Sequence, residues 1–177
     1  MKLLKIIGGI IVGLLLIFFI GGLFLPKTYS VNRTTVINAP DSVIYKNIAD
    51  FNEFLKWNPW AKMEPTAKTT ISGPVAQPEH LYQWEGKETG SGQMKITGVE
   101  ANKMVNIELK FIKPFESIAN TNFEIVKDGN GNKVIWTISG ESKGTMDKWM
   151  GLCMDGMIGK DFEAGLKFLK EKSEKGN

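Results

Sequence analysis

Few residues of this sequence combine in a pattern that supports catalysis. The 177 residues hold a single histidine, His80, and a single cysteine, Cys153. Paired-histidine and cysteine-based metal sites are therefore excluded, as is a disulfide within the chain. We expect His80, next to Pro78-Glu79, in a solvated turn, and Cys153, among methionines, as a small buried hydrophobe. No P-loop, Rossmann glycine pattern or nucleophile elbow occurs.

The acid–base candidate is Glu85, which lies between Trp84 and Gly86. A carboxylate facing an apolar cavity can transfer protons near neutral pH. Strict alternation, however, places Glu85 opposite Tyr82 and Trp84, towards solvent. The sequence therefore favours binding over catalysis, and it predicts no cofactor and no metal.

Four methionines form the most regular apolar set of the sequence. Met146, Met150, Met154 and Met157 are spaced by 4, 4 and 3 residues, so they share one face of a helix predicted over Thr145 to Lys172. Such a stripe either packs as ordinary core or forms an adaptable cavity wall, since thioether chains fit irregular ligands.

Aromatic residues supply the other binding candidates. Trp57 and Trp60 flank Asn58-Pro59 and either plug the core or gate an entrance. Trp84 and Trp136 fall at inward strand positions, and Phe115 lies in a turn where it can meet a ligand entrance or a membrane surface. The candidate ligand-binding residues are Trp57, Trp60, Trp84, Phe111, Phe115, Trp136, Met146, Met150, Met154 and Met157.

Period-2 alternation dominates the middle of the chain and predicts an α+β fold. A first strand over residues 29–37 precedes two short helical segments, which start at residue 41 or 42 and at Phe51. Consecutive strands follow from residue 81 to residue 138, with a hairpin turn at Asp128-Gly129-Asn130-Gly131. No helix separates these strands, so an antiparallel meander is expected.

Residues 6–25 are all apolar or glycine and can span about 30 Å as a helix, the thickness of a hydrocarbon core. A cleaved signal peptide shares the basic start at Lys2 and Lys5, but its apolar part is usually shorter and ends at a small-residue cleavage site. We predict an anchor over residues 1–25 and a domain over residues 26–177. The positive-inside rule favours a single-pass membrane protein with a cytoplasmic N-terminus and an extracytoplasmic domain.

The charge balance argues against a nucleic-acid partner. The net charge is +3, from 22 basic and 19 acidic residues. Arg33 is the only arginine, whereas phosphate recognition relies on the planar guanidinium group.

Several segments resemble the START-like helix-grip superfamily, and more narrowly the bacterial SRPBCC proteins of the polyketide cyclase/dehydrase-like branch, several of which carry an N-terminal membrane anchor. The matching segments are Val36-Ile37-Asn38-Ala39-Pro40, Asp50-Phe51-x-x-Phe54-x-x-Trp57-Asn58-Pro59-Trp60, Tyr82-x-Trp84-Glu85-Gly86, Phe111-Ile112-Lys113-Pro114-Phe115, and Gly151-Leu152 with Lys160-Asp161-Phe162. The resemblance covers about residues 30 to 172. It implies an antiparallel sheet curved around the long C-terminal helix, with an apolar cavity between them.

Three functions agree with these observations. The first is membrane-tethered, reversible binding of a hydrophobic small molecule or lipid. The alternatives are a cyclase-like or hydrolytic enzyme that uses a cavity carboxylate, and a tethered protein-interaction domain with a filled core. A cavity volume below about 300 Å³ would favour the filled core, because ligand pockets usually exceed it. The sequence leaves the oligomeric state open.

Overall fold

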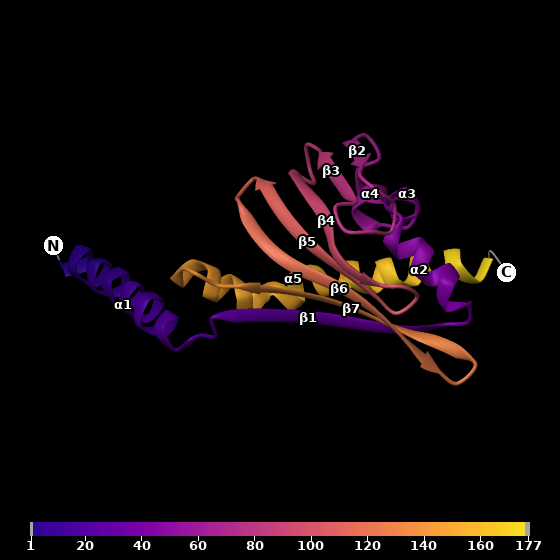
Figure 1. The fold of residues 1–177 in the computed structure, drawn as a ribbon. Coiled ribbons are helices and arrows are strands. Elements are labelled where there is room, and N and C mark those ends of the chain that lie inside the picture. Colours follow the sequence, from indigo (N-terminus) through magenta and orange to yellow (C-terminus); the bar gives the residue numbers. More distant parts are fainter. Residues whose placement is uncertain (1, 176–177) are drawn as a thin grey trace.

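A computed structural model describes residues 2–175 as five helices and seven strands (Figure 1). In chain order these are α1 (Lys2–Phe24), β1 (Thr28–Ile37), α2 (Asp41–Ala49), α3 (Phe51–Phe54), α4 (Pro59–Met63), β2 (Lys68–Ser72), β3 (Leu81–Glu85), β4 (Ser91–Glu100), β5 (Met104–Lys113), β6 (Ser117–Asp128), β7 (Gly131–Glu141) and α5 (Thr145–Lys175). The last two residues of the domain predicted over 26–177 lie outside the described residues.

The strands form one antiparallel sheet in the order β1-β7-β6-β5-β4-β3-β2. β2 to β7 follow one another as a meander, and β1 pairs with β7 along its whole length. Register shifts in β4, beside Gly92 and Gly98, mark bulges that bend the sheet. The predicted α+β helix-grip architecture, with α5 lying along the concave sheet, is confirmed (Figure 1).

Two elements, α4 and β2, are absent from the prediction. Asn58-Pro59 marks the end of a helical segment in the sequence, because a residue before proline avoids helical dihedrals. The same pair also begins α4: Asn58 Oδ1 accepts the Trp60 N–H at 3.0 Å, and Pro59 occupies the first helical position. β2 is a short edge strand with mostly exposed residues, so it lacks the alternation that marks the other strands.

The only arginine of the chain fixes α5 to β1. Arg33 Nη1 donates to Asp155 at 2.7 Å and Arg33 Nε donates to Glu163 at 2.7 Å. The guanidinium lies against the backbone of Gly159, where a Cβ would collide with it. These hydrogen bonds, above all the one to Asp155, raise the pKa of Arg33, and Arg33 lowers the pKa of Asp155.

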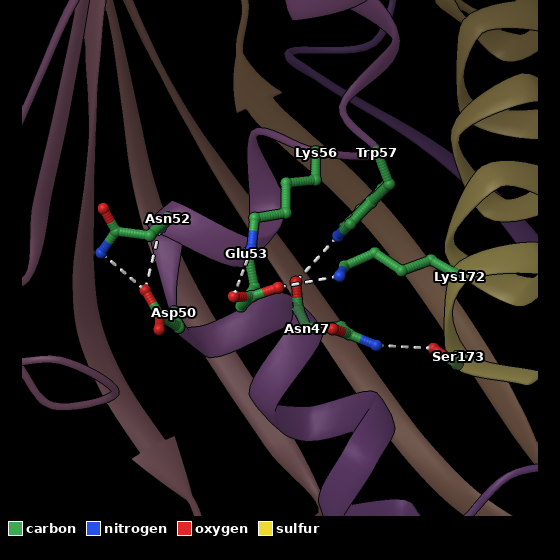
Figure 2. A network of polar contacts seen from close by, with 8 residues as sticks. All are labelled: Asn47, Asp50, Asn52, Glu53, Lys56, Trp57, Lys172 and Ser173. Carbon is green, nitrogen blue, oxygen red and sulfur yellow. Dashed lines mark hydrogen bonds and ion pairs between the residues drawn. The ribbon is translucent and has the colours of Figure 1, made fainter. Parts of the chain in front are cut away.

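One end of the space between sheet and helix is filled by α2 and α3, and we call it the closed end. It consists of the fully buried side chains Ile44, Ile48, Phe51, Phe54 and Trp57. Figure 2 shows the polar contacts that hold it. Trp57 Nε1 donates to the Asn47 carbonyl at 2.8 Å, and Asn47 Nδ2 donates to Ser173 of α5 at 3.0 Å.

An ion pair beside these contacts ties α3 to α5. Glu53 accepts from Lys172 at 2.8 Å and from Lys56 at 2.6 Å (Figure 2). The hydrogen bond from Lys172, followed by that from Lys56, lowers the pKa of Glu53 from 4.5 to about 2. His80 is fully buried here, stacked on Phe51, and its Nε2 accepts the Phe51 N–H at 3.1 Å. The other ring nitrogen, Nδ1, lies 3.1 Å from the Ser72 carbonyl oxygen. The prediction of a solvated turn histidine is therefore wrong, because His80 is buried and both of its ring nitrogens have partners within the fold.

Among the described residues, α1 is the one helix long and apolar enough to cross a membrane. It extends from the end of the domain opposite α2 and α3 (Figure 1). Its apolar side chains are exposed along most of its length. A signal sequence has the same character, so the spanning role is developed below as a proposal.

Candidate functional site

Beyond the closed end, the space between α5 and the sheet is hollow. A cavity of about 600 Å³ lies between β3 to β7, α4 and the middle of α5, and we call this part of the domain the open end. Its wall is mostly apolar and aromatic. The volume lies within the roughly 300–1,000 Å³ range of small-molecule sites.

Strand side chains that face α5 make the floor of the cavity. Trp84 and Tyr82 come from β3, and the two rings stack with centroids 5.7 Å apart. Trp84 also meets Phe111 of β5 edge to face at 6.1 Å. The indole crosses over Gly92 of β4, where a Cβ would meet the ring at 2.5 Å. Glycine at this position therefore leaves room for the Trp84 ring in the cavity wall.

Trp136 of β7 forms the boundary between the cavity and the closed end. Its ring stacks on Phe162 of α5, with centroids 3.9 Å apart, and on Phe123 at 4.9 Å. Trp136 Nε1 donates to Thr121 Oγ1 at 2.9 Å, and that hydroxyl donates to the Thr137 carbonyl at 2.8 Å. The polar atoms at the base of the cavity are therefore paired, which leaves the wall apolar.

The mouth is framed by α4, the β3–β4 turn and α5. Trp60 of α4 packs edge-on against Trp136 and Phe162, with centroids 6.0 and 6.2 Å away. Met154 and Asp161 of α5 line the opposite side. Ionisable side chains thus lie at the rim, and aromatic side chains line the interior.

Glu64 holds the β3–β4 turn against α4. Its side chain is buried, with an exposed fraction of 8%. Oε2 accepts from the Thr89 N–H at 2.9 Å, the Thr89 hydroxyl at 2.8 Å and the Glu88 N–H at 3.1 Å, and Oε1 accepts from the Lys87 N–H at 2.7 Å. The Thr89 backbone bond, followed by that from Lys87, lowers the pKa of Glu64 from 4.5 to about 2. The carboxylate is therefore a fixed anion that latches the turn.

Tyr82 is a titratable group in the aromatic part of the wall. Burial raises its pKa from 10.0 to about 12, so the phenol stays protonated at physiological pH. Near neutral pH this wall therefore offers a neutral hydroxyl, while the carboxylate of Glu64 is already occupied by donors.

Five of the ten candidate residues from the sequence meet around this cavity. They are Trp60, Trp84, Phe111, Trp136 and Met154. The strand residues are found because alternation fixes which side chains share the concave face. Met154 is the one methionine of the helical stripe that reaches the wall.

Met146, Met150 and Met157 are instead exposed, with exposed fractions of 61%, 46% and 58%. The stripe was expected to be either ordinary core or a cavity wall, and the orientation of α5 makes both wrong for these three residues. The helix turns about 100° per residue, so these three methionines point roughly 160° away from the buried face of Phe162 and Leu166. Cys153, expected to be buried, is exposed on the same outer side.

The other three candidates also lie away from the cavity wall. Trp57 is fully buried in the closed end, so it is core rather than gate. Phe115 is 80% exposed in the β5–β6 turn. Glu85 is exposed and does not line the cavity, as its strand parity indicates.

Several cavity residues had no clear signal in the sequence. Glu64 follows α4, which was not predicted, and its partners come 23 to 25 residues later. Leu109 faces inward with Phe111 and was visible only as part of an alternating strand. Within residues 2–175, no three His, Cys, Asp or Glu side chains converge closely enough to hold a metal ion.

Comparison with known families gives one match, which spans the domain. Residues 28–174 match the family described as polyketide cyclase/dehydrase and lipid transport. None of the curated proteins matches the sequence.

Solved structures share the fold at low sequence identity. Protein Ms6760 from Mycobacterium smegmatis superposes with a TM-score of 0.58 and 15% identity, over 80% of this chain and 88% of that chain. Protein MLL2253 from Mesorhizobium loti gives 0.59 and 14%, over 81% and 98%. The di-domain ARO/CYC StfQ from the steffimycin biosynthetic pathway gives 0.61 and 7%, over 84% and 51%. At these identities the likeness establishes the fold.

Proposed function

This chain belongs to the polyketide cyclase/dehydrase and lipid transport family, and we propose that its domain reversibly binds a hydrophobic small molecule or lipid in the cavity of the open end. The observation that carries the proposal is the cavity itself, with its volume of about 600 Å³ and its aromatic wall. Removal of apolar surface from water drives such binding, at about 25 cal/mol per Å² before ordering is subtracted.

The volume argues against the filled-core alternative. A tethered interaction domain needs no interior space, yet this cavity is about twice the 300 Å³ at which ligand pockets begin. The contrast with the closed end supports the same view, because the same helix and sheet enclose fully packed side chains there.

The polar groups around the cavity favour binding over proton transfer. Glu64 is held as an anion by four hydrogen bonds, and Tyr82 is held neutral by burial. Neither group changes its charge near pH 7, which a general acid or base there has to do. These two groups therefore suit reversible binding, and an enzymatic role requires another group, such as the lining carboxylates of Glu88 or Asp161.

We further propose that α1 tethers the domain to a membrane as a single-pass anchor, with residues 1–25 as anchor and the domain from residue 26 onward. Lys2 and Lys5 precede the apolar run, whereas Lys27 and Arg33 follow it. With the N-terminal amine, the balance favours a cytoplasmic N-terminus and an extracytoplasmic domain.

The test is uptake of a dansyl-labelled long-chain fatty acid by the full chain in vesicles, followed by energy transfer from the cavity tryptophans. Met154→Lys places a charge in the wall and should weaken uptake at least tenfold, or about 1.4 kcal/mol. Met154→Trp adds bulk to the wall without a charge and should weaken uptake less than Met154→Lys.

Val75→Lys is the matched control, because Val75 is an exposed apolar residue of the β2–β3 loop, away from the cavity. The same vesicles contain every variant, so partition of the probe into lipid cancels. Equal uptake by wild type and both Met154 variants, all folded by circular dichroism, would overturn the carrier function.

A further inference from the structure

The start of α5 is fastened to the end of α1. The Trp149 ring stacks on Phe18 with centroids 6.2 Å apart, and Trp149 Nε1 donates to the Phe18 carbonyl at 3.1 Å. Lys148 Nζ donates to the Gly22 carbonyl at 2.9 Å. A Cβ at Gly22 would collide with Thr145, so glycine permits this close approach. The apolar helix therefore sets where the start of α5 lies.

This attachment gives the start of α5 a depth relative to a bilayer. Phe18 lies six residues before Phe24, the last residue of α1, which is about 9 Å along the helix. A spanning α1 therefore holds Trp149 about 9 Å inside the end of the helix, within the bilayer and below the lipid headgroups. The apolar ring of Trp149 suits this depth, because its polar N–H is paired with the Phe18 carbonyl.

The same part of α5 exposes an apolar face. Met146, Met150, Cys153 and Met157 are spaced by 4, 3 and 4 residues and share one side of the helix, and all four are exposed. In a soluble protein a continuous apolar face of this kind marks an interaction site.

A second exposed apolar element lies at the same end of the domain. The β5–β6 turn and the start of α5 both lie at the end of the domain from which α1 extends (Figure 1). It exposes Phe115 by 80%, and Ile118 at the start of β6 by 59%. Lys113 and Glu116 flank Phe115 with opposite charges, so this surface is apolar rather than basic.

We propose that these two elements form a membrane-contacting surface, made of Met146, Met150, Cys153, Met157 and Phe115, that rests on the bilayer holding α1. This inference depends on the tether in the proposed function. Continuity with the apolar helix identifies the partner as lipid, because a spanning α1 places the start of α5 at the bilayer.

The surface also determines where the cavity opens. Met154 lines the mouth and lies one turn beyond Met150 on α5, while Phe111 lies four residues before Phe115 on β5. The proposed surface thus brings the cavity lining close to the bilayer. A hydrophobic ligand then passes between bilayer and cavity with little exposure to water, which removes the largest barrier to its transfer.

The only cysteine of the chain reports on this surface. The full chain is reconstituted in phosphatidylcholine vesicles, and the rate of Cys153 modification by a charged, membrane-impermeant maleimide is divided by the rate in the unfolded chain. Cys153 is exposed with α1 in place, so shielding has to come from the bilayer. The matched control is Asn130→Cys with Cys153→Ser, in the exposed β6–β7 turn.

We expect Cys153 to react at least tenfold more slowly than the Asn130→Cys thiol. Met146→Asp with Met150→Asp should raise the Cys153 rate at least fivefold, because charges oppose contact with lipid. Equal rates for Cys153 and the control, with dansyl-probe uptake intact, overturn the surface and leave the carrier function standing. A shielded Cys153 without uptake of the dansyl probe overturns the carrier function and leaves the membrane-contacting surface standing. Release of the chain by alkaline carbonate overturns the tether and the surface together.

Discussion

The closed and open ends of the domain lie under the same sheet and the same helix, yet one is packed and the other is hollow. At the closed end, α2 and α3 insert Ile44, Ile48, Phe51 and Phe54 between the layers. At the open end α4 is the short helix that lies over the cavity, and it contributes Trp60 at the rim. The sheet and α5 are common to both ends. The difference therefore shows that the side chains inserted from the short helices determine where a cavity remains.

The largest effect that tests this comparison comes from the two tryptophans around Asn58-Pro59. Trp57→Ala should destabilise the domain by about 3–5 kcal/mol, because it leaves a large void and an unpaired Asn47 carbonyl. Trp60→Ala should cost roughly 1–2 kcal/mol, since its void joins the existing cavity. Urea unfolding of both variants measures the difference, and equal losses would show that the two ends are packed alike.

The next effect concerns the latch of the open end. Glu64→Gln replaces one accepting oxygen by an NH₂ group, which cannot accept the backbone N–H groups of the turn. We therefore expect faster hydrogen exchange at Lys87 and Thr89 and unchanged exchange in α2. A carboxylate with a lowered native pKa stabilises the fold above its ordinary pKa and loses that contribution as pH falls. Wild-type stability should therefore drop between pH 4.5 and about 2, and more steeply than in Glu64→Gln.

Glu53 titrates over the same range, because its pKa is also lowered to about 2. It belongs to the closed end and is present in both proteins, so the difference between wild type and Glu64→Gln isolates the latch. Identical pH profiles for the two proteins would mean that Glu64 does not hold the turn.

A smaller effect tests how α5 is held over both ends. Gly159→Ala improves helix propensity by about 1 kcal/mol but collides with the Arg33 guanidinium. We expect a net destabilisation in wild type and a stabilisation of up to about 1 kcal/mol in an Arg33→Ala background. Thermal unfolding of the four proteins gives the sign of the stability change in each background. The same sign in both would show that the Arg33 guanidinium does not oppose a side chain at residue 159.

The smallest effect is expected at Glu85. Its side chain is exposed and lies outside the cavity wall. Glu85→Gln should leave uptake of the dansyl fatty acid within about twofold of wild type, because the charge is screened by water. A tenfold change would instead place Glu85 at the cavity mouth.

The strands and their inward faces could be predicted from the sequence because alternation is a local property. Trp84, Phe111 and Trp136 are placed correctly by parity alone. The methionine stripe could not be oriented in this way. Helical spacing shows which residues share a face, but the direction of that face follows from the packing of Phe162 and Leu166 further along α5.

The mouth of the cavity was unpredictable for a different reason. Glu64 acquires its role from backbone groups of the β3–β4 turn, which reach it only through the fold. The volume of the cavity likewise depends on which side chains are missing between two layers. No local pattern encodes that quantity, and the family resemblance supplied the expectation of a cavity.

The most direct test of the central claim, that the open end holds a hydrophobic ligand, is native mass spectrometry of the full chain released gently from membranes. We predict one retained lipid-sized adduct per chain in wild type and in Val75→Lys, and its loss in Met154→Lys, which places a charge in the apolar wall. Adducts that persist equally in folded Met154→Lys, or a wild-type chain that carries none and takes up none of the dansyl fatty acid, would overturn ligand binding at the open end.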